Sequence, residues 1–486
     1  MKLIASEESG VAVTSRAEQR SSGLSLGLLR WFLAAAAAMV VYQTMVPPVV
    51  GLANQSDFRR VIGKFGYGPE EPILVSAIAM KYVPDATYRV PTWEQFSSEE
   101  FFVRAALAVN RVLSKDGKLD IRVMGFVHDV AFLAALAWLL RATRRWVMAW
   151  PAIVFIATDA AYVAYLNSFY TEPASLIFIL LLIAESIAIC SNGLTTAGLT
   201  RWIAWSVLLV LAKPINAPLG VLLGLFALRL SPRSWIARSG AAAIACVSVF
   251  MIATTPREIK AASAYNLVFL SVLPESRMPA ADAASLGLPA GSEDYSRIGA
   301  WAPGSPLDDL KARGVIGGKV TVWTVVRFYL SRPARMWRHI AENLRVAMLA
   351  RPDLGNFGRS AGYPPMAQSK AFSLWSDFHR LVLVRVSRAA FFALIAAVIV
   401  LCCRSRHSLA QDFTLLLAAS CLCAFLAASF GDAWDTVRHM FLFNVLLDAS
   451  AITGVMAGGY GIVRVFGLRH PSRDARTISV NYFRLN

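Results

Sequence analysis

Long apolar stretches recur along the whole chain, and no other feature of the sequence limits its fold as strongly. Hydrophobic residues fill 56% of the 486 positions, charged residues fill only 16%, and the mean hydropathy is +0.52. That much apolar surface cannot be hidden in one ordinary soluble core, whereas segments of about 20 apolar residues have the length of a membrane-spanning helix. The sequence therefore predicts an all-α polytopic membrane protein.

The chain carries a formal net charge of +17, which taken alone would suit a nucleic-acid-binding protein. Its basic residues, however, concentrate at the ends of the apolar segments, where lysine and arginine set the orientation of a membrane protein. We therefore expect the lipid bilayer as a partner and no nucleic acid. The six cysteines lie in apolar segments or at their ends without metal-ligand spacing, so the sequence predicts neither a disulfide framework nor a zinc site.

The basic residues of the short loops also predict the topology. Spans of about 20 residues give about ten transmembrane helices, two long extracytoplasmic segments and both termini in the cytoplasm. The first span is expected from about Arg30 to Val50 and the third from Trp146 to Tyr165. The predicted organisation is a cytoplasmic tail (1–29), a transmembrane core (30–255) that includes a first outer loop (51–122), a large extracytoplasmic segment with interfacial helices (256–388), C-terminal transmembrane helices (389–465) and a cytoplasmic tail (466–486).

The apolar stretch Trp202–Leu230 is interrupted at Lys213–Pro218, and each half is short for a full span. Counted as one span, it would place the basic residues that follow it on the outer side. The sequence therefore predicts a tight hairpin whose tip points outward.

A second local pattern lies inside the large outer segment. Around residues 332–346, Met336, Ile340 and Leu344 recur at helical spacing, with arginines on the other faces. This pattern predicts a helix in the lipid headgroup layer, and packing against the neighbouring outer domain is the alternative.

The stretch Asn54–Arg60 directly follows the first span, so the carboxylate of Asp57 and the guanidiniums of Arg59 and Arg60 are expected to emerge together at a membrane surface. Opposite charges nearby keep a carboxylate ionised and able to act as a base. Asp57 is thus the candidate catalytic residue, and the two arginines are candidate substrate ligands. The alternative is that Asp57 caps a short helix beginning at Phe58.

Two more polar clusters are predicted on the same side of the membrane. Glu172 follows Thr171 and precedes Pro173, a combination that a helix start explains fully and to which a substrate contact would be additional. Lys213 and Asn216 lie at the break of the hairpin, where irregular backbone usually lines a polar cavity and where a lysine can also simply reach the surface.

The densest polar group in any short loop is Gly431–Met440. Within it Asp435, Arg438 and His439 are candidate substrate ligands, since arginine binds phosphate through two parallel hydrogen bonds. In the same loop, Asp432 is explained as a helix cap and Trp434 as an anchor at the membrane interface.

Two acids, Asp159 and Asp448, fall well inside predicted spans. A charged side chain at the bilayer centre costs about 2.5 to 3.5 kcal/mol, so each should face the protein interior. They favour a proton-coupled transporter, and hydrogen bonding between helices is an equally good explanation.

Taken in order along the chain, five motifs resemble the GT-C superfamily of polytopic glycosyltransferases, and more narrowly the bacterial glycan biosynthesis hexosyltransferases. The resemblance implies a polyprenyl-phosphate sugar donor, an acid in the first outer loop as general base, and inversion at the anomeric carbon. By position the base is Asp57, with polar contacts from Glu172 and the Lys213 hairpin, and Asn356 becomes a further candidate substrate ligand. The motifs are Asn54–Arg59, Asn167–Pro173, Ala212–Asn216, Arg351–Phe357 and Gly431–His439 leading into Phe441–Asn444.

The expected activity is therefore transfer of a hexose to a glycan or lipid-linked acceptor on the outer face of a bacterial inner membrane. Many members of the superfamily carry two acids in the first loop, but Asp57 has no acidic neighbour. No cofactor is firmly predicted, and a divalent metal is compatible with the pattern without being indicated by it. The alternatives are a transporter or flippase for a lipid-linked saccharide, and a ligase or polymerase that joins whole glycans.

Overall fold

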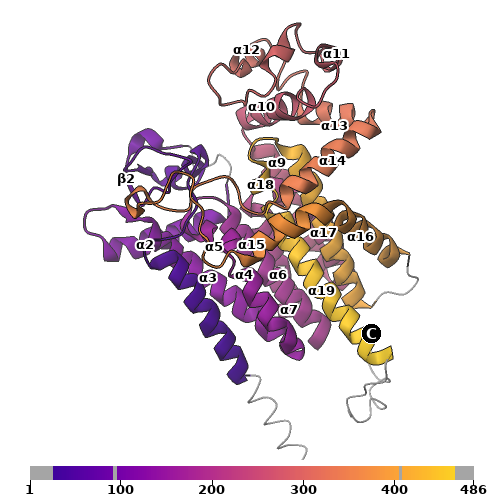
Figure 1. Ribbon diagram of the computed structural model, residues 1–486. Coiled ribbons are helices and arrows are strands. Elements are labelled where there is room, and N and C mark those ends of the chain that lie inside the picture. The colour runs from indigo at the N-terminus through magenta and orange to yellow at the C-terminus, as the bar shows by residue number, and fades with distance from the viewer. Residues whose placement is uncertain (1–25, 91–95, 404–407, 466–486) are drawn as a thin grey trace, which may run out of the picture.

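The computed structural model describes residues 26–90, 96–403 and 408–465. Nearly all of the two predicted cytoplasmic tails, 1–29 and 466–486, therefore lies outside the described residues. Most of the described chain is helical, and the helices form a bundle with two folded segments at one end (Figure 1). The protein is an all-α polytopic membrane protein, as predicted.

Of the roughly ten crossings predicted, six appear in the described residues as helices long and apolar enough to cross a membrane, and a seventh if a helix pair bent by 54° is counted as one span. Three further apolar helices are shorter. The six are Leu26–Met45, α3 (Ile121–Ala142), α6 (Glu172–Asn192), α9 (Trp235–Thr254), the continuous helix Leu374–Cys402 and α17 (Leu409–Gly431). The shorter ones are α7 (Thr196–Ala212), α8 (Leu219–Leu230) and the described part of α19 (Phe441–Val465).

The bent pair corresponds to the predicted third span. It comprises η4 (Arg144–Ala149), α4 (Trp150–Ala157), α5 (Ala160–Val163) and η5 (Ala164–Asn167). The bend falls at Asp159, whose backbone is extended and whose carboxylate accepts the Ala161 N–H at 2.8 Å. An N-cap inside an apolar stretch ends one helix and begins another.

The two halves of Trp202–Leu230 form the predicted hairpin. The short helix η6 (Pro214–Asn216) separates α7 from α8. At the tip, Lys213 pairs with Glu172 at the first residue of α6, and at the opposite end Arg229 pairs with Asp412 in the first turn of α17 at 2.9 Å. The chain therefore reverses at Lys213 instead of continuing through.

The first segment outside the bundle follows the helix Leu26–Met45 and contains a small antiparallel sheet of strand order β1-β2-β3, an exception within the helical fold. Its own core surrounds Phe58, Tyr82 and Phe169. A hydrogen bond between Glu99 and His128, at 2.7 Å, joins it to α3. The elements are η1 (Ser56–Arg60), η2 (Ile62–Phe65), β1 (Tyr67–Pro69), β2 (Lys81–Pro84), η3 (Ala86–Tyr88), α2 (Glu99–Leu113) and β3 (Leu119–Asp120).

The second such segment stands above the bundle in Figure 1, where α10 to α13 surround a separate hydrophobic core. The helix predicted for the headgroup layer is α14, and the structure supports the packed alternative: His339 is buried and lies within hydrogen-bond distance of Ser271 in the second segment, at 2.9 Å. Helix α14 also contacts the bundle, where Ala347 accepts a hydrogen bond from Asn444 of α19. The elements are α10 (Arg257–Asn266), η7 (Leu267–Val272), α11 (Pro279–Ser285), η8 (Ser292–Tyr295), α12 (Leu307–Ala312), α13 (Val322–Leu330) and α14 (Pro333–Ala347).

The chain between α14 and the next span, residues 348–373, runs back to the first segment before it re-enters the bundle. Asn356 donates to the carbonyl of Gly51, and the Ala160 N–H donates to the carbonyl of Phe372. The helix that follows begins at Leu374, well before the predicted start at Ala389. Its parts are α15 (Leu374–Phe378), η10 (His379–Leu383) and α16 (Val384–Cys402), preceded by η9 (Arg359–Ala361).

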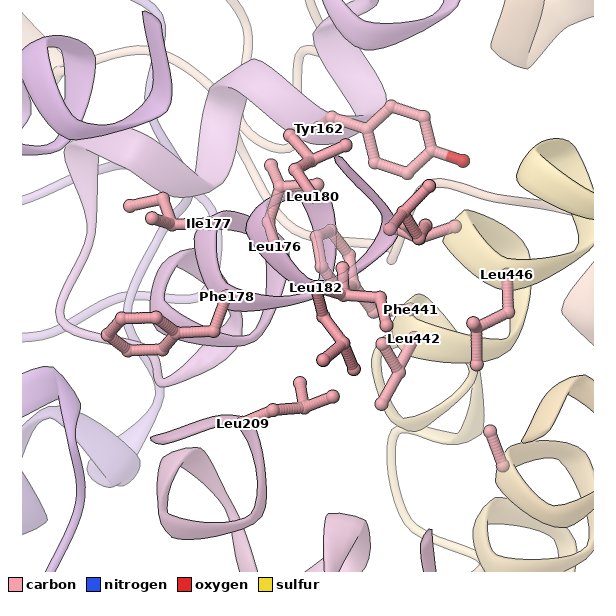
Figure 2. Packing of buried hydrophobic residues seen from close by; sticks show 14 of the residues in the cluster. Tyr162, Leu176, Ile177, Phe178, Leu180, Leu182, Leu209, Phe441, Leu442 and Leu446 are labelled. Atoms are coloured by element: carbon pink, nitrogen blue, oxygen red, sulfur yellow. The ribbon is translucent and has the colours of Figure 1, made fainter. Parts of the chain in front are cut away.

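Helix α6 is the centre of the bundle. It has the highest mean hydropathy of the long helices, 2.4, and most of it is buried inside the protein. In Figure 2 leucines of α6, among them Leu176 and Leu182, share an apolar interior with Leu442 and Leu446 of α19. Because the first residue of α6 is Glu172, the best-packed helix fixes the position of a predicted site residue.

Candidate active site

A cavity of about 610 Å³ lies where the bundle meets the two outer segments. Asp57 reaches it from η1, Lys213 from the hairpin tip, and Arg438 and His439 from the short helix α18 (Thr436–His439). The opposite wall comes from the end of α9, from α10 and from loops of the second segment. It includes Ile252, Thr255, Ile259, Lys260, Ser263, Asn266, Trp301 and Val322.

Asp57 makes two ion pairs in this cavity. Its Oδ2 accepts from Nη2 of Arg438 at 2.5 Å, and its Oδ1 lies 3.0 Å from Nη1 of Arg60. Burial would raise the pKa of the Asp57 carboxyl, but the two guanidiniums outweigh burial and hold that pKa well below its usual range. The side chain is 21% exposed, so Asp57 is both ionised and reachable from the cavity.

Arg438 connects three carboxylates. Besides Asp57, its Nε donates to Asp435 at 2.6 Å, and its Nη1 lies 3.5 Å from Oε1 of Glu172. The guanidinium also stacks over the ring of Tyr170, with its central carbon 4.6 Å from the ring centre. With only 5% of its side chain exposed, Arg438 is a buried cation held in place from four directions.

Lys213 extends the charged cluster toward His439. Its ammonium donates to Glu172 at 2.7 Å and lies 3.4 Å from Nδ1 of His439. Burial, together with the charges of Lys213 and Arg438, lowers the pKa of His439 well below its usual range. The imidazole is therefore neutral at ordinary pH, and its nitrogen accepts from the ammonium.

The local backbone explains how Arg438 and His439 reach the cavity. Asp432 ends α17 and accepts hydrogen bonds from Ser263 and Asn266 of α10, at 2.9 and 3.0 Å, which ties this loop to the second outer segment. Asp435 then adopts a left-handed conformation with φ of 55°, which turns the chain into α18. That conformation is tolerated by aspartate better than by most residues.

Four sequence segments with candidate site residues thus meet at this end of the bundle. The first contributes Asp57 and Arg60, the second Glu172, the third Lys213, and the fourth Asp435, Arg438 and His439. Glu172 and Asp435 lie behind the cavity wall and contact its cations. Oxygen Oε2 of Glu172 has no hydrogen-bond partner among the described residues.

Besides Glu172 and Asp435, three further predicted ligands do not line the cavity. Arg59 points away and donates to the carbonyl of Thr87 at 3.3 Å. Asn216 is buried at the hairpin tip and donates to Ser175 and Leu209, which satisfies the freed backbone carbonyl of Leu209. Neither side chain lines the cavity, so a substrate contact by Arg59 or Asn216 stays a prediction without support from this geometry.

Asn356 is the third of these ligands. It is buried in the segment 348–373, which returns to the first outer segment. Its amide donates to Gly51, and its oxygen accepts from Arg351 at 2.7 Å and from the Ser369 N–H at 3.0 Å. Every polar atom of this side chain holds backbone in place, so the structure gives it a supporting role in the fold.

Other residues of the site carry no signal that marked them beforehand. Tyr170 lies inside the motif Asn167–Pro173. An aromatic residue at such a position is more often part of the hydrophobic core than a ring that stacks against an arginine, so the sequence did not mark it. Lys260 and Trp301 come from the second outer segment, whose contact with the cavity requires the folded structure. No spacing in the sequence places them beside Asp57.

The two acids inside the spans have structural partners. Asp159 accepts the backbone N–H groups of Trp375 and Ser376, at 2.9 and 3.1 Å, in addition to that of Ala161. Asp448 accepts from Tyr162 at 2.5 Å and from the Trp375 indole at 2.8 Å. Each acid therefore cross-links helices, which is the second of the two sequence explanations.

Within the described residues no group of three or more His, Cys, Asp and Glu side chains is arranged to hold a metal ion. Comparison of the chain with curated proteins and with solved structures gives no match. The family described as YfdI N-terminal transmembrane domain matches residues 17–459. Because that match covers most of the sequence, the chain belongs to the YfdI N-terminal transmembrane domain family.

Proposed function

We propose that the chain is an inverting glycosyltransferase of the GT-C type, which moves a hexose from a polyprenyl-phosphate donor to a glycan or lipid-linked acceptor. The observation that carries the proposal is the position of Asp57, an ionised carboxylate in a cavity of about 610 Å³ with Arg60, Lys213 and Arg438 around it. A base and several cations at one end of a membrane bundle suit a reaction on a lipid phosphate.

In the proposed reaction a hydroxyl of the acceptor attacks the anomeric carbon of the donor hexose. The new glycosidic bond forms as the bond from that carbon to the phosphate oxygen breaks, and polyprenyl phosphate leaves with the electron pair. The hydroxyl proton passes to Asp57. Arg438, Arg60 and Lys213 stabilise the negative charge that develops on the leaving phosphate.

The same cations explain how a carboxylate with a depressed pKa can act as a base. A donor phosphate competes with Asp57 for Arg438 and Arg60, because both are anions that guanidinium binds through paired hydrogen bonds. As the cations turn toward the phosphate, the pKa of Asp57 rises toward the range useful for proton transfer. Donor binding would in this way prepare the base.

The apolar part of the donor determines where this chemistry takes place. We place the site on the extracytoplasmic face of a bacterial inner membrane, with both termini in the cytoplasm, because basic residues crowd the opposite end of the bundle. The transporter alternative has less support, since Asp159 and Asp448 are both engaged in hydrogen bonds between helices.

The proposal is tested by supplying purified protein with radiolabelled polyprenyl-phosphate hexoses and following consumption of the donor. Replacing Asp57 with Asn should lower turnover at least about 100-fold while donor binding persists, because the amide keeps the shape but cannot accept the proton. Asp116→Asn is the matched control: it lies in the same loop, is exposed and does not line the cavity. Normal turnover by Asp57→Asn would refute the role of this residue as base.

A further inference from the structure

The end of the bundle opposite the Asp57 cavity has a second polar site, a hollow of about 460 Å³ where α3 ends, η4 begins and α6 ends. Helix α6 runs for 21 residues from Glu172, so the hollow lies about 30 Å from the candidate active site at a rise of about 1.5 Å per residue. Three arginines line it, together with Trp138, Ser191 and Asn192: they are Arg141, Arg144 and Arg145.

These arginines are exposed and form no ion pair within the part of the chain that the structure describes. Other arginines at this end of the bundle do have acidic partners: Arg201 pairs with Glu185 at 2.9 Å, and Arg229 pairs with Asp412. Three unpaired guanidiniums around one hollow present up to fifteen N–H donors, at five per side chain, without a protein acceptor. This arrangement favours a bound anion.

An apolar groove of about 690 Å³ begins at the same place, and Arg145 lines both the hollow and the groove. The groove runs between α3 and α4 on one side and α17 and α19 on the other, with α6 along its length. From Cys190 to Leu176 it follows α6 over a rise of about 20 Å. Its deeper end includes Tyr162 and Asp448, which are hydrogen-bonded to each other.

We propose that the hollow and the groove together bind one anionic phospholipid, with its phosphate among Arg141, Arg144 and Arg145 and an acyl chain along α6. Basic pockets between transmembrane helices bind anionic headgroups in this way. The length of the groove decides for a phospholipid over a polyprenyl phosphate: one leaflet of the hydrocarbon core is about 15 Å thick, so a groove of about 20 Å suits an acyl chain and is too short for a long isoprenoid.

Such a lipid would complete the packing of the bundle. Groove-lining residues of α4 and α17, such as Ile153, Ile156 and Phe413, face the same apolar space. An acyl chain in that space supplies van der Waals contacts that α4 and α17 do not make with each other. The site is independent of the transfer reaction, because it uses none of the residues around Asp57.

The proposal is tested with detergent-purified full-length protein and added dioleoyl phosphatidylglycerol, by native mass spectrometry. Arg144→Gln/Arg145→Gln should weaken retention of this lipid roughly tenfold, because each arginine near an anionic headgroup contributes to binding. The matched control is Arg233→Gln/Arg238→Gln, which removes two exposed arginines in or near the loop between α8 and α9, at the same end of the bundle and outside both sites. The control should retain the lipid as the wild type does.

A second pair of variants tests the groove without changing charge. Ala449→Phe fills it from α19 and should reduce lipid retention, whereas Val455→Phe, on a side chain 76% exposed on the same helix, should not. Equal retention by the arginine variant and its control would overturn the proposal. So would equal binding of zwitterionic phosphatidylcholine, or a preference for polyprenyl phosphate over phosphatidylglycerol.

Discussion

Arg438 controls the electrostatics of the candidate site at the scale of single residues. It neutralises Asp57 while it also contacts Asp435 and Glu172, so the cation expected to hold a phosphate is held by carboxylates in the structure. Breaking a buried ion pair by removing one partner leaves the other charge uncompensated. For this reason the more exposed Arg60, at 37%, is the better position for a test.

We expect Arg60→Gln to move the acidic limb of the pH–rate profile to higher pH. Arg438 and Arg60 hold the pKa of Asp57 low, so losing one of them raises that pKa, and more acid-side activity is lost because the base must be ionised. The rate at neutral pH should also fall about 10- to 100-fold through weaker stabilisation of the leaving phosphate. The measurement is kcat/KM against pH.

Arg59→Gln is the control for this prediction. Arg59 is next to Arg60 in the sequence, but its guanidinium donates to the carbonyl of Thr87 and does not line the cavity. Its acidic limb should match that of the wild type. If both variants shift alike, the effect is one of general charge and not of the ion pair with Asp57.

A second residue, Gly125 of α3, supports the site through packing. A Cβ atom there would lie 1.9 Å from Oδ1 of Asn167, whose amide nitrogen donates to Thr44 and Val50 at the end of the first helix. Gly125→Ala should therefore lower the free energy of unfolding by about 1–3 kcal/mol, as overpacking does. Thermal unfolding in detergent measures the change.

Gly454→Ala in α19 provides the comparison, because nothing lies within 4 Å of the added atom. It should be neutral or stabilising by up to about 1 kcal/mol, the helix preference of alanine over glycine. A Gly125→Ala protein as stable as Gly454→Ala would contradict the close approach seen at Asn167.

The sequence located most of the charged cluster because ionised groups beside apolar spans are expensive and therefore conspicuous. Asp57, Glu172, Lys213, Arg438 and His439 all stood out in this way. Asn356 and Asn216 lie outside the cavity and hold backbone instead, a difference the sequence does not show, because an amide can satisfy buried backbone as well as a substrate.

Among the secondary-structure elements, one chain reversal was predictable from the sequence and one bend was not. The reversal at Lys213 was predictable, because basic residues after the second half required it. The bend in the third span was not, although Asp159 was noticed: its carboxylate caps α5 and also accepts two N–H groups of α15, which lies 215 residues further along the chain. Such a contact leaves no local pattern.

This shared cap gives a prediction at the scale of elements. Asp159→Ala leaves two buried N–H groups and the half-buried N–H of Trp375 without their acceptor, and each unsatisfied buried group costs about 1–3 kcal/mol, so the variant should be at least about 2 kcal/mol less stable. Thermal unfolding would show this loss, whereas Asp353→Ala, an exposed acid in the returning segment, should unfold like the wild type. Equal stability of the two variants would contradict the double cap.

At the scale of the whole molecule, the cavity depends on three parts that are far apart in sequence. The first outer segment provides Asp57, the bundle provides Lys213 and Arg438, and the second outer segment provides the wall with Trp301. Composition and charge predicted that the two outer segments exist. They did not predict that the second segment covers the end of the bundle where Asp57 lies. That arrangement follows from the hydrogen bonds of Asp432 to α10.

The proposed sidedness of the molecule gives the last prediction. The helix Leu26–Met45 begins, and α19 ends, at the end of the bundle away from the outer segments (Figure 1), so one labelling experiment places every part at once. In a background with the six cysteines replaced, Lys115→Cys should react with a membrane-impermeant maleimide in intact spheroplasts, whereas Arg233→Cys should react only after permeabilisation. Both positions are in loops, and they lie toward opposite ends of the bundle. Labelling of Arg233→Cys before permeabilisation, with Lys115→Cys protected, would invert the topology and place the Asp57 cavity on the cytoplasmic side.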